Sequence, residues 1–530
     1  MLRRTVCRST ATVCRSTARL SSSIAFSQRA EASPLNFAKA TTAFQGTSTV
    51  ELLRGAAVLT ACSQPWLVHH AKSTIDASYR LFGRRATEAV LRHTAFAHFV
   101  AGESAEEIAP KLQALRDVGV GGILDYAAEA SLDEDDAPPH GVNQPARVYP
   151  FQNEEVCEEN KRIFIDAVDA VHATTPEGFA AVKVTALGDP MLLERVSTAI
   201  VQLHAFFDRL AEGRGVLSRE QFVAGWRSAF DVGDEAISEM LSRLRADATG
   251  HIDVIEFTNA LPLEAVGPLV QSCRAHGPLY HSALDQEECA ALERMLSRLD
   301  EIASRAKALD VRLMIDAEHT CFQPAIDHAV LRLSRTHNQT YPCCFGTYQA
   351  YLKECETKLH RDLDRASREG WHLGAKLVRG AYMVHERERA RELGYPDPIQ
   401  PTAEATHASY DAAIRALLLH CPCPERTSVM VASHNRSSVE YAARLLLGEE
   451  SRVPANRVVF GQLLGMADHL TFTLAAHGLK AYKYVPYGPV REVLPYLIRR
   501  AQENADALSG AAEQRNMMLK EVGRRMGVFA

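Results

Sequence analysis

The 530-residue chain lacks several features that would place it in a simple class. It has no run of about 18 apolar residues, the length that spans a bilayer; the nearest approach, residues 56–62, is far too short. Its 12 cysteines show neither CxxC spacing nor a zinc-ligand pattern, so free thiols in a reducing compartment are the simplest interpretation. The net charge of −6 gives no support to nucleic-acid binding. No GxGxxG motif follows a predicted strand, because leucine stands where GVGGIL would need its last glycine, and this disfavours a doubly wound dinucleotide-binding sheet.

Acidic residues are missing from the N-terminus. None occurs before Glu31, whereas the first 30 residues carry six arginines, many serines and threonines, and two tandem copies of TVCRSTA. An Arg-rich, Ser-rich and acid-free start is typical of a mitochondrial transit peptide. We therefore predict a transit peptide over residues 1–35; a basic disordered arm is the alternative.

The region that follows shows helical patterns and no pattern that indicates a catalytic or binding site. Thr47 or Ser48 can cap a helix that runs through Val58, and residues 86–99 form an amphipathic pattern. We expect these helices to pack or to provide a partner surface. Contact of the apolar patch at 56–66 with a membrane face is the alternative.

Eight apolar stretches alternate with helical stretches from residue 119 onward. Each ends in polar residues, among them Asp125, Asp316, Gln349 and His434. This alternation is the signature of a (β/α)8 TIM barrel, whose active sites lie at the C-terminal strand ends. We predict this α/β fold, preceded by N-terminal helices. The predicted divisions are 36–115 for the N-terminal helical region, 116–188 and 304–510 for the two parts of the barrel, 189–303 for an insertion, and 511–530 for a C-terminal helix or tail.

The insertion falls between predicted strands two and three, where a barrel needs a single helix. Two of its segments, LAEGRGVLSREQF and RADATGHIDVIEF, are spaced like a pair of EF-hand loops, with Gly215 and Gly250 at the tight-turn position. Leu210 and Arg245, however, occupy the first-ligand positions, where an aspartate is expected. We predict a helical EF-hand-like unit without a working calcium site, and no metal.

The stretch from residue 482 to 504 concentrates candidate binding residues. It is predicted to form a strand, a Pro–Gly turn and then a helix from residue 490. Arg499 and Arg500 point about 100° apart on that helix, and Glu503 is spaced to hold them. Two fixed cations beside Tyr484 suit a small carboxylate; a solvated helix face with an ion pair is the alternative.

The strand-end residues as a set lack a nucleophile poised beside a base and lack a metal-ligand pattern. They are rich in cations and hydrogen-bond donors, which suits a phosphate-bearing cofactor and a small carboxylate substrate. The set comprises Lys183, Asp316, Gln349, Arg379, His434, Asn435, Tyr484, Arg499 and Arg500.

Six motifs, in this order along the chain, resemble those of the proline dehydrogenases. They are LMIDAEHTCFQPAI, AKLVRGAYM, VMVASHN, FGQLLGM, YKYVPYGP and YLIRRAQEN. The resemblance covers about residues 119–188 and 305–510 and is strongest to the eukaryotic mitochondrial enzymes. It implies a distorted barrel, non-covalent FAD, and oxidation of L-proline to Δ1-pyrroline-5-carboxylate. It further implies electron transfer to ubiquinone by a protein in peripheral contact with the inner mitochondrial membrane, on its matrix side.

The resemblance also assigns roles to individual residues. The implied substrate residues are Lys183, Asp316, Leu463, Tyr484, Tyr496, Arg499 and Arg500, with Glu129 as a gate that pairs with Arg499. The implied flavin residues are Asp316, Ala317, Gln349, Lys376, Val378, Arg379, Gly380, Ala381, Met383, Thr406, His434, Asn435, Gln462, Leu463, Arg500 and Glu503. Lys376 stands where the bacterial enzymes carry an arginine. The positive charge is kept, but the planar guanidinium that can donate two parallel hydrogen bonds is lost.

Two other functions compete with proline oxidation. The hydroxyproline dehydrogenases share nearly every motif but carry a serine where this chain has Tyr484, whose ring leaves little room for a ring hydroxyl. A calcium-sensing or scaffold protein on a non-catalytic barrel is the alternative outside the enzymes. The complete set of pocket residues argues against it.

Overall fold

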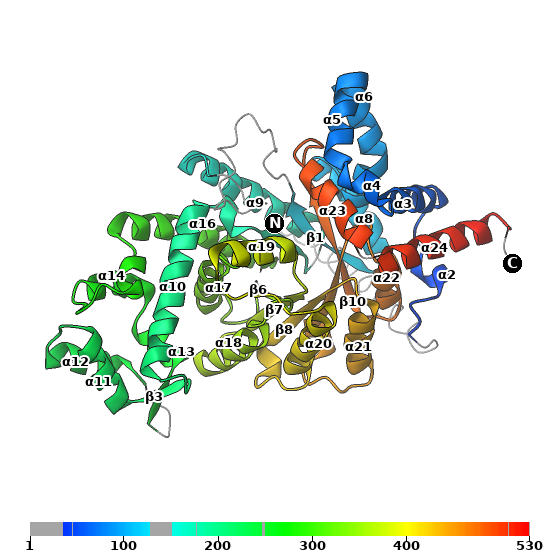
Figure 1. Cartoon of the computed structure of the whole chain (residues 1–530). Helices are drawn as coiled ribbons and strands as arrows, with labels where there is room; N and C mark the ends of the chain where they lie inside the picture. The colour runs from blue at the N-terminus through cyan, green and yellow to red at the C-terminus, as the bar shows by residue number, and fades with distance from the viewer. Residues whose placement is uncertain are drawn as a thin grey trace, which may run out of the picture.

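The computed structural model describes residues 35–44, 46–127, 151–175, 177–245, 250–506 and 508–528, with the backbone alone for 105, 502–506 and 508–510. Its centre is a closed barrel of eight parallel strands in the order β1–β10–β9–β8–β7–β6–β5–β2 (Figure 1). The predicted (β/α)8 fold is confirmed. The strands are β1 (Val120–Tyr126), β2 (Phe179–Val182), β5 (Arg312–Ile315), β6 (Cys344–Gln349), β7 (Leu373–Val378), β8 (Thr427–Ala432), β9 (Val458–Leu463) and β10 (Lys480–Tyr487).

Helices cover the outside of the barrel (Figure 1). The strands are buried on both faces, which is why they are nearly continuous apolar runs in the sequence. The helices that follow the strands are α9 (Glu154–Thr174), α10 (Pro190–Leu210), α16 (Gln286–Ala308), α17 (Gln323–His337), α18 (Cys355–Glu369), α19 (Met383–Leu393), α20 (Ala403–Leu418), α21 (Arg436–Leu447), α22 (Asp468–Ala476) and α23 (Leu494–Asp506).

A compact apolar plug fills the lower part of the barrel. The ring of Phe179 meets those of Phe345 and Tyr482 edge to face, at centroid distances of 5.5 and 5.0 Å. On β7 this position is Gly374, where a Cβ would lie 2.8 Å from the Phe345 ring. The complete plug is Ile123, Phe179, Met314, Phe345, Met430, Val459 and Tyr482. Because side chains alternate along a strand, the next inward position of each strand lies directly above the plug.

Two element boundaries differ from the sequence expectations. The apolar stretch AAVKVTALG predicts a second strand at 181–186, but β2 spans Phe179–Val182, and a 3₁₀ turn at Val184–Ala186 follows it. The helix expected from residue 490 begins at Leu494, as α23. Pro495 explains the later start, since proline is favoured in a first helical turn, where its missing N–H does no harm.

The N-terminal helix α3 (Thr49–Cys62) packs on the C-terminal helix α24 (Leu508–Arg525). Ser48 begins α3 with a capping box, in which its hydroxyl accepts from the Glu51 N–H. The apolar patch suggested as a possible membrane contact is largely internal, because Ala56, Val58, Leu59 and Cys62 are buried in this packing. Within the described ranges, no helix is both long and apolar enough to cross a bilayer.

The insertion lies between β2 and β5 and has a hydrophobic core of its own (green, Figure 1). Its short strands β3 (Val216–Ser218) and β4 (His251–Asp253) pair antiparallel, with Leu217 opposite Ile252. Each is preceded by a glycine with positive φ, Gly215 at +72° and Gly250 at +84°. The helices between α10 and α16 are α11 (Arg219–Ala229), α12 (Asp234–Arg243), α13 (Val254–Ala260), α14 (Leu263–Val270) and α15 (Pro278–Ser282).

We expect calcium to change neither the melting temperature nor the activity of the protein. The first-ligand positions of the two loops hold Leu210 and Arg245, which bring no negative charge to a hard cation. The measurement is a calcium titration followed by thermal melting, with magnesium as the control. A rise of several degrees at micromolar calcium would contradict the prediction.

Candidate active site

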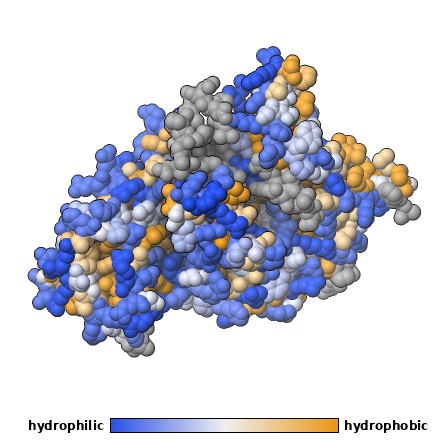
Figure 2. Space-filling model, viewed as in Figure 1, coloured by the Kyte–Doolittle hydropathy of each residue, from blue (hydrophilic) through white to orange (hydrophobic). Residues whose placement is uncertain are grey.

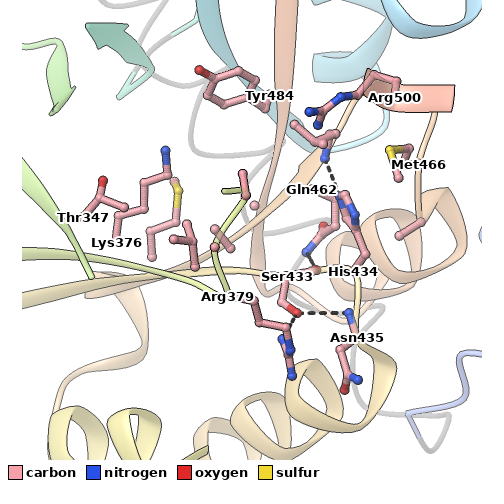
Figure 3. A pocket seen from close by; sticks show the side chains of 18 of the residues that line it. Thr347, Lys376, Arg379, Ser433, His434, Asn435, Gln462, Met466, Tyr484 and Arg500 are labelled. Atoms are coloured by element: carbon pink, nitrogen blue, oxygen red, sulfur yellow. Dashed lines mark hydrogen bonds between the residues drawn. The ribbon is translucent and has the colours of Figure 1, made fainter. Parts of the chain in front are cut away.

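The C-terminal ends of the barrel strands surround a cavity of about 890 Å³. Figure 3 shows Lys376 and Tyr484 on one side of it and Arg379, Ser433 and Asn435 on the other. The cavity lining brings together these predicted residues: Lys183, Asp316, Ala317, Gln349, Lys376, Val378, Arg379, Gly380, Ala381, His434, Asn435, Gln462, Leu463, Tyr484, Tyr496, Arg499 and Arg500.

Asp316 is the centre of a charged cluster directly above the plug. Its Oδ1 accepts from the Lys376 ammonium at 2.7 Å, and its Oδ2 accepts from the Tyr484 hydroxyl at 2.9 Å. Lys183 lies 3.9 Å from the same carboxylate. Asp316, Lys376 and Tyr484 each stand two residues beyond the plug position of their strand, which is why three separate strands deliver them to one level.

The protonation states of this cluster follow from its contacts. Burial alone would raise the pKa of Asp316, but the ammonium groups of Lys376 and Lys183 and the two hydrogen bonds outweigh burial, so the pKa lies below its usual value. Burial, with Asp125 and Asp316 nearby, raises the pKa of Tyr484 well above its usual value. The cluster therefore holds a carboxylate and a neutral phenol that donates to it.

Asp125 is a cluster member that the sequence-based set omitted. It is 3 % exposed, and its Oδ1 lies 3.5 Å from Lys183 Nζ. Lys183 is thus shared between two carboxylates, one from β1 and one from the residue after β5. The sequence did carry a signal, since Asp125 ends the first apolar strand, but local sequence cannot show which lysine it faces.

Helix α23 supplies the predicted arginine pair. Tyr496 and Arg500 are buried and Arg499 is half-buried, and all three line the cavity. The guanidinium carbons of Arg500 and Arg499 lie 4.8 and 5.9 Å from the centre of the Tyr496 ring. Stacking on one ring holds both cations on the same side of the cavity, although adjacent helical residues diverge.

The opposite side of the cavity is a set of hydrogen-bond donors at the start of α21. Asn435 caps this helix by accepting from the Ser438 N–H at 3.1 Å. Arg379 donates to the hydroxyls of Ser433 and Ser438 and lies 4.3 Å over the Tyr410 ring. A helix N-terminus beside a fixed guanidinium is suited to an anion such as a phosphate.

His434 is held as a neutral ring between these two sides. The Leu463 N–H donates to its Nε2 at 3.0 Å, so the ring proton lies on Nδ1. Burial, followed by the charges of Lys483, Arg500 and Arg379, lowers its pKa to about 3. The neighbouring Gln462 donates to the Ser433 carbonyl and accepts from the Thr471 hydroxyl, at 3.3 and 2.9 Å.

We expect stability to fall as the pH drops from about 6.5 towards 4. Burial lowers the pKa of His98 and of His469 to about 4, in addition to the effect on His434. Below pH 6.5 the unfolded chain binds protons at these rings while the folded chain does not, so protonation favours unfolding. The measurement is melting temperature against pH. His98→Gln should flatten the slope, and an unchanged slope would contradict the assignment.

Lys483 is a further residue that sequence reasoning missed. It is fully buried, pairs with Asp468 at 2.6 Å, and donates to the carbonyls of Met466 and Leu463 at 2.7 and 3.2 Å. It points away from the barrel interior because it alternates with Tyr482 and Tyr484. It therefore holds the loop after β9, part of which lines the cavity.

Four predicted site residues stand apart from this lining. Met383 is 47 % exposed at the start of α19, and Thr406 lies half-buried on α20 with its hydroxyl bonded to the Thr402 carbonyl. Glu129 lies outside the described residues, as does the side chain of Glu503. Besides Asp125, the lining adds further residues that the sequence-based set did not include, among them Ile123, Thr347, Met430, Ser433, Arg436, Met466 and His469.

The donor set fits the FAD that the sequence analysis predicted. Arg379, Arg436 and the start of α21 supply the cations and N–H groups that a pyrophosphate needs. Gly380, in the wall, has a φ of +135°, and a Cβ there would lie 2.3 Å from the Tyr351 ring. The absence of a side chain leaves the backbone itself at the cavity surface.

Comparison with known proteins identifies the family. The model of the family described as proline dehydrogenase matches residues 108–513. The chain is 35% identical to human "Proline dehydrogenase 1, mitochondrial" over 93% of this chain and 90% of that protein. The chain belongs to the proline dehydrogenase family. The Drosophila melanogaster protein of the same name is 34% identical over 91% of this chain, and Xenopus laevis hydroxyproline dehydrogenase is 32% identical over 91%.

Solved structures agree on the fold of this proline dehydrogenase family member. Proline utilization A from Bdellovibrio bacteriovorus, inactivated by N-propargylglycine, superposes with a TM-score of 0.53 at 16% identity over 92% of this chain. Proline utilization A from Bradyrhizobium japonicum gives 0.50 at 17% identity over 90% of this chain. This chain spans 41% and 42% of those longer proteins. At such identities the superpositions show the barrel fold.

Proposed function

We propose that the protein oxidises L-proline to Δ1-pyrroline-5-carboxylate with non-covalently bound FAD. It passes the electrons to ubiquinone at the matrix side of the inner mitochondrial membrane. The observation that carries the proposal is one cavity with two chemically different sides. Arg499, Arg500 and the Asp316 cluster all line the cavity, and Figure 3 shows Arg379, with the phosphate-suited donors around it, on the side away from Tyr484 and Arg500. Family membership and relatives named mitochondrial support it.

The arginine pair would bind and orient the substrate. A proline carboxylate held by Arg499 and Arg500 through charge-assisted hydrogen bonds has a fixed position and direction. Holding the ring in one orientation supplies much of the acceleration that oxidation of its C–N bond requires. When bound, FAD would accept the hydride from Cδ, the carbon next to the nitrogen that does not carry the carboxylate.

The charges of the pocket favour the reactive form of the substrate. Oxidation requires the ring nitrogen as the free base. Lys183, Lys376, Arg499 and Arg500 bring four cations to the pocket, against the carboxylates of Asp316 and Asp125 and that of the substrate. An excess of positive charge lowers the pKa of the substrate ammonium group. The arrangement requires no protein nucleophile.

The visible spectrum of the purified protein tests the proposal. We expect a yellow protein with flavin absorption that bleaches when L-proline is added without oxygen. Reoxidation by a soluble quinone analogue then tests the acceptor class separately. A protein that stays colourless after addition of FAD would point to a non-catalytic scaffold on the same barrel.

Hydroxyproline is the second candidate substrate, because hydroxyproline dehydrogenases match this chain over 91% of its length. The position of Tyr484 favours proline. Its hydroxyl is committed to Asp316, which fixes the ring against the pocket. A substrate hydroxyl placed against that ring is crowded or loses its hydrogen bonds, at about 1–3 kcal/mol.

We expect Tyr484→Ser to narrow the preference for proline over 4-hydroxyproline by about tenfold or more. The smaller residue opens space for the ring hydroxyl and offers it a partner. The measurement is kcat/KM for both amino acids on both proteins, with Tyr482→Phe, in the plug below, as the control. A wild-type protein that prefers hydroxyproline would contradict the substrate assignment.

A further inference from the structure

Three short helices form a projection at one side of the barrel, seen at the top of Figure 1. They are α4 (Pro65–His69), α5 (Ala71–Phe82) and α6 (Arg84–Leu91). None of the 12 residues of α5 is buried, and the helix packs against α4 and α6. A helix with so little burial gains little stability from packing. Its presence therefore calls for an explanation other than the stability of the barrel.

The far end of the projection carries apolar side chains. Leu81 is 76 % exposed and Phe82 is 72 % exposed, at the junction where Gly83 turns the chain with a φ of +75°. Figure 2 shows apolar side chains beside hydrophilic ones on this projection. Val90, on α6, is 63 % exposed. Adjacent exposed leucine and phenylalanine at a turn are uncommon on soluble surfaces and indicate a binding element.

Cations flank this apolar pair on both sides. Arg80 precedes it, and Arg84 and Arg85 follow Gly83. Over residues 65–91 the cations are Lys72, Arg80, Arg84 and Arg85, and the carboxylates are Asp76 and Glu88. The projection therefore has a net charge of +2 in a chain whose net charge is −6. The projection is positive where the protein as a whole is negative.

We propose that the far end of the projection, residues 80–85, which we call the apex, docks on a bilayer that contains anionic phospholipids. Leu81 and Phe82 enter the boundary between headgroups and acyl chains, and the flanking arginines bind lipid phosphates. A narrow projecting turn suits a soft bilayer, which closes around an inserted side chain. A protein partner would need about 800 Å² of matching surface, and a turn of a few residues does not supply it.

The position of the projection connects it to the active site. Helix α4, at its base, packs against α23, the helix that carries Arg499 and Arg500. Docking would place the bilayer on the side of the barrel where α23 borders the cavity. This link rests on the proposed function, because it matters for an electron acceptor that is dissolved in the bilayer.

Vesicle sedimentation with the full chain tests the proposal. We expect binding to phosphatidylcholine vesicles that contain 20 mol% cardiolipin, and at least tenfold weaker binding by the variant Leu81→Ser/Phe82→Ser. The matched control is Val201→Ser/Leu447→Ser, at two positions each 48 % exposed on α10 and α21. The control should bind like the wild type. Equal vesicle binding by the wild type and the Leu81/Phe82 variant would overturn the proposal. So would a wild type that does not bind vesicles, a result that would favour a protein partner instead.

The charge contribution is tested on vesicles of neutral and anionic composition. Arg80→Gln/Arg85→Gln should lose most of the preference for cardiolipin and the sensitivity to salt. Insertion is tested with Phe82→Trp in a Trp66→Phe background, since Trp226 and Trp371 are buried and give a constant signal. On vesicle binding, we expect the fluorescence of the new tryptophan to shift to the blue and to be quenched by brominated lipid. Binding without either would overturn the insertion of the apex.

The experiments distinguish a failure of the proposed function from a failure of the docking proposal. Reduction of a soluble dye with proline should be the same in the wild type and in all of these variants, because none of the substituted residues lines the cavity. A wild type that binds vesicles but does not reduce the dye would refute proline oxidation and leave the docking surface standing.

Discussion

Asp316→Asn is expected to lower kcat/KM for proline by about 10²- to 10³-fold, the effect of truncating one partner of a buried, hydrogen-bonded charge pair. The substitution keeps the shape of the side chain and removes its charge. Lys376, which is 7 % exposed, then loses its 2.7 Å ion pair, and the Tyr484 hydroxyl loses a charged acceptor. Both side chains lose the contact that fixes their position in the proposed substrate pocket.

The experiment must separate a loss of positioning from a loss of folding. The rate of flavin bleaching by proline under anaerobic conditions is measured per bound flavin, together with the melting temperature. Asp327→Asn is the matched control, because Asp327 pairs with Lys358 at 3.0 Å on the outer helices. We expect it to lower stability and leave the bleaching rate unchanged. Equal rates for the Asp316 variant and the wild type would remove Asp316 from the reaction.

Arg499→Ala and Arg500→Ala are each expected to lower kcat/KM for proline by about a hundredfold or more. Each would remove the proposed charge-assisted contact to the substrate carboxylate in a largely buried setting. Arg500 is the more buried of the two, at 8 % exposed, and its larger desolvation predicts the larger loss. A lysine at either position should restore part of the activity, because it keeps the charge but loses the planar fork.

The amount of bound flavin separates a loss of proline binding from a loss of the folded site. We expect Arg499→Ala to keep most of the flavin, because Arg499 is not among the residues implied to contact it, and to raise the KM for proline more than it lowers kcat. Arg515→Ala is the control, since Arg515 lies on α24, bonded to the Ser63 hydroxyl, and does not line the cavity. If proline kinetics were unchanged in both arginine variants, the carboxylate would have to bind elsewhere in the cavity.

Much of the fold could be predicted from the sequence because its signals are local. A strand buried on both faces must be apolar over its whole length, and a helix on the outside must alternate with a period of 3.6 residues. These periods identified eight strands with polar residues at their ends, and with them the barrel. The motif YLIRRAQEN likewise placed Arg499 and Arg500 on one helix.

The contacts within the site could not be predicted from the same signals. Lys183 lies within an apolar stretch of sequence, where a charge is costly unless it is paired, but its partner Asp125 lies in another strand. Asp316 and Tyr484 are 168 residues apart in the chain and 2.9 Å apart in the molecule. Closure of the barrel, in which β10 pairs with β1, makes them neighbours.

The sequence by itself determined the class of fold, the polar strand ends and the chemical type of each candidate residue. These properties depend on residue type and on spacing within a few turns of chain. The tertiary structure decided which charges share a partner, the position of the start of α23, the burial of Lys483, and the exposure of Leu81 and Phe82. These depend on which distant segments pack together, because burial and ion pairing are set by neighbours in space and not by neighbours in the chain.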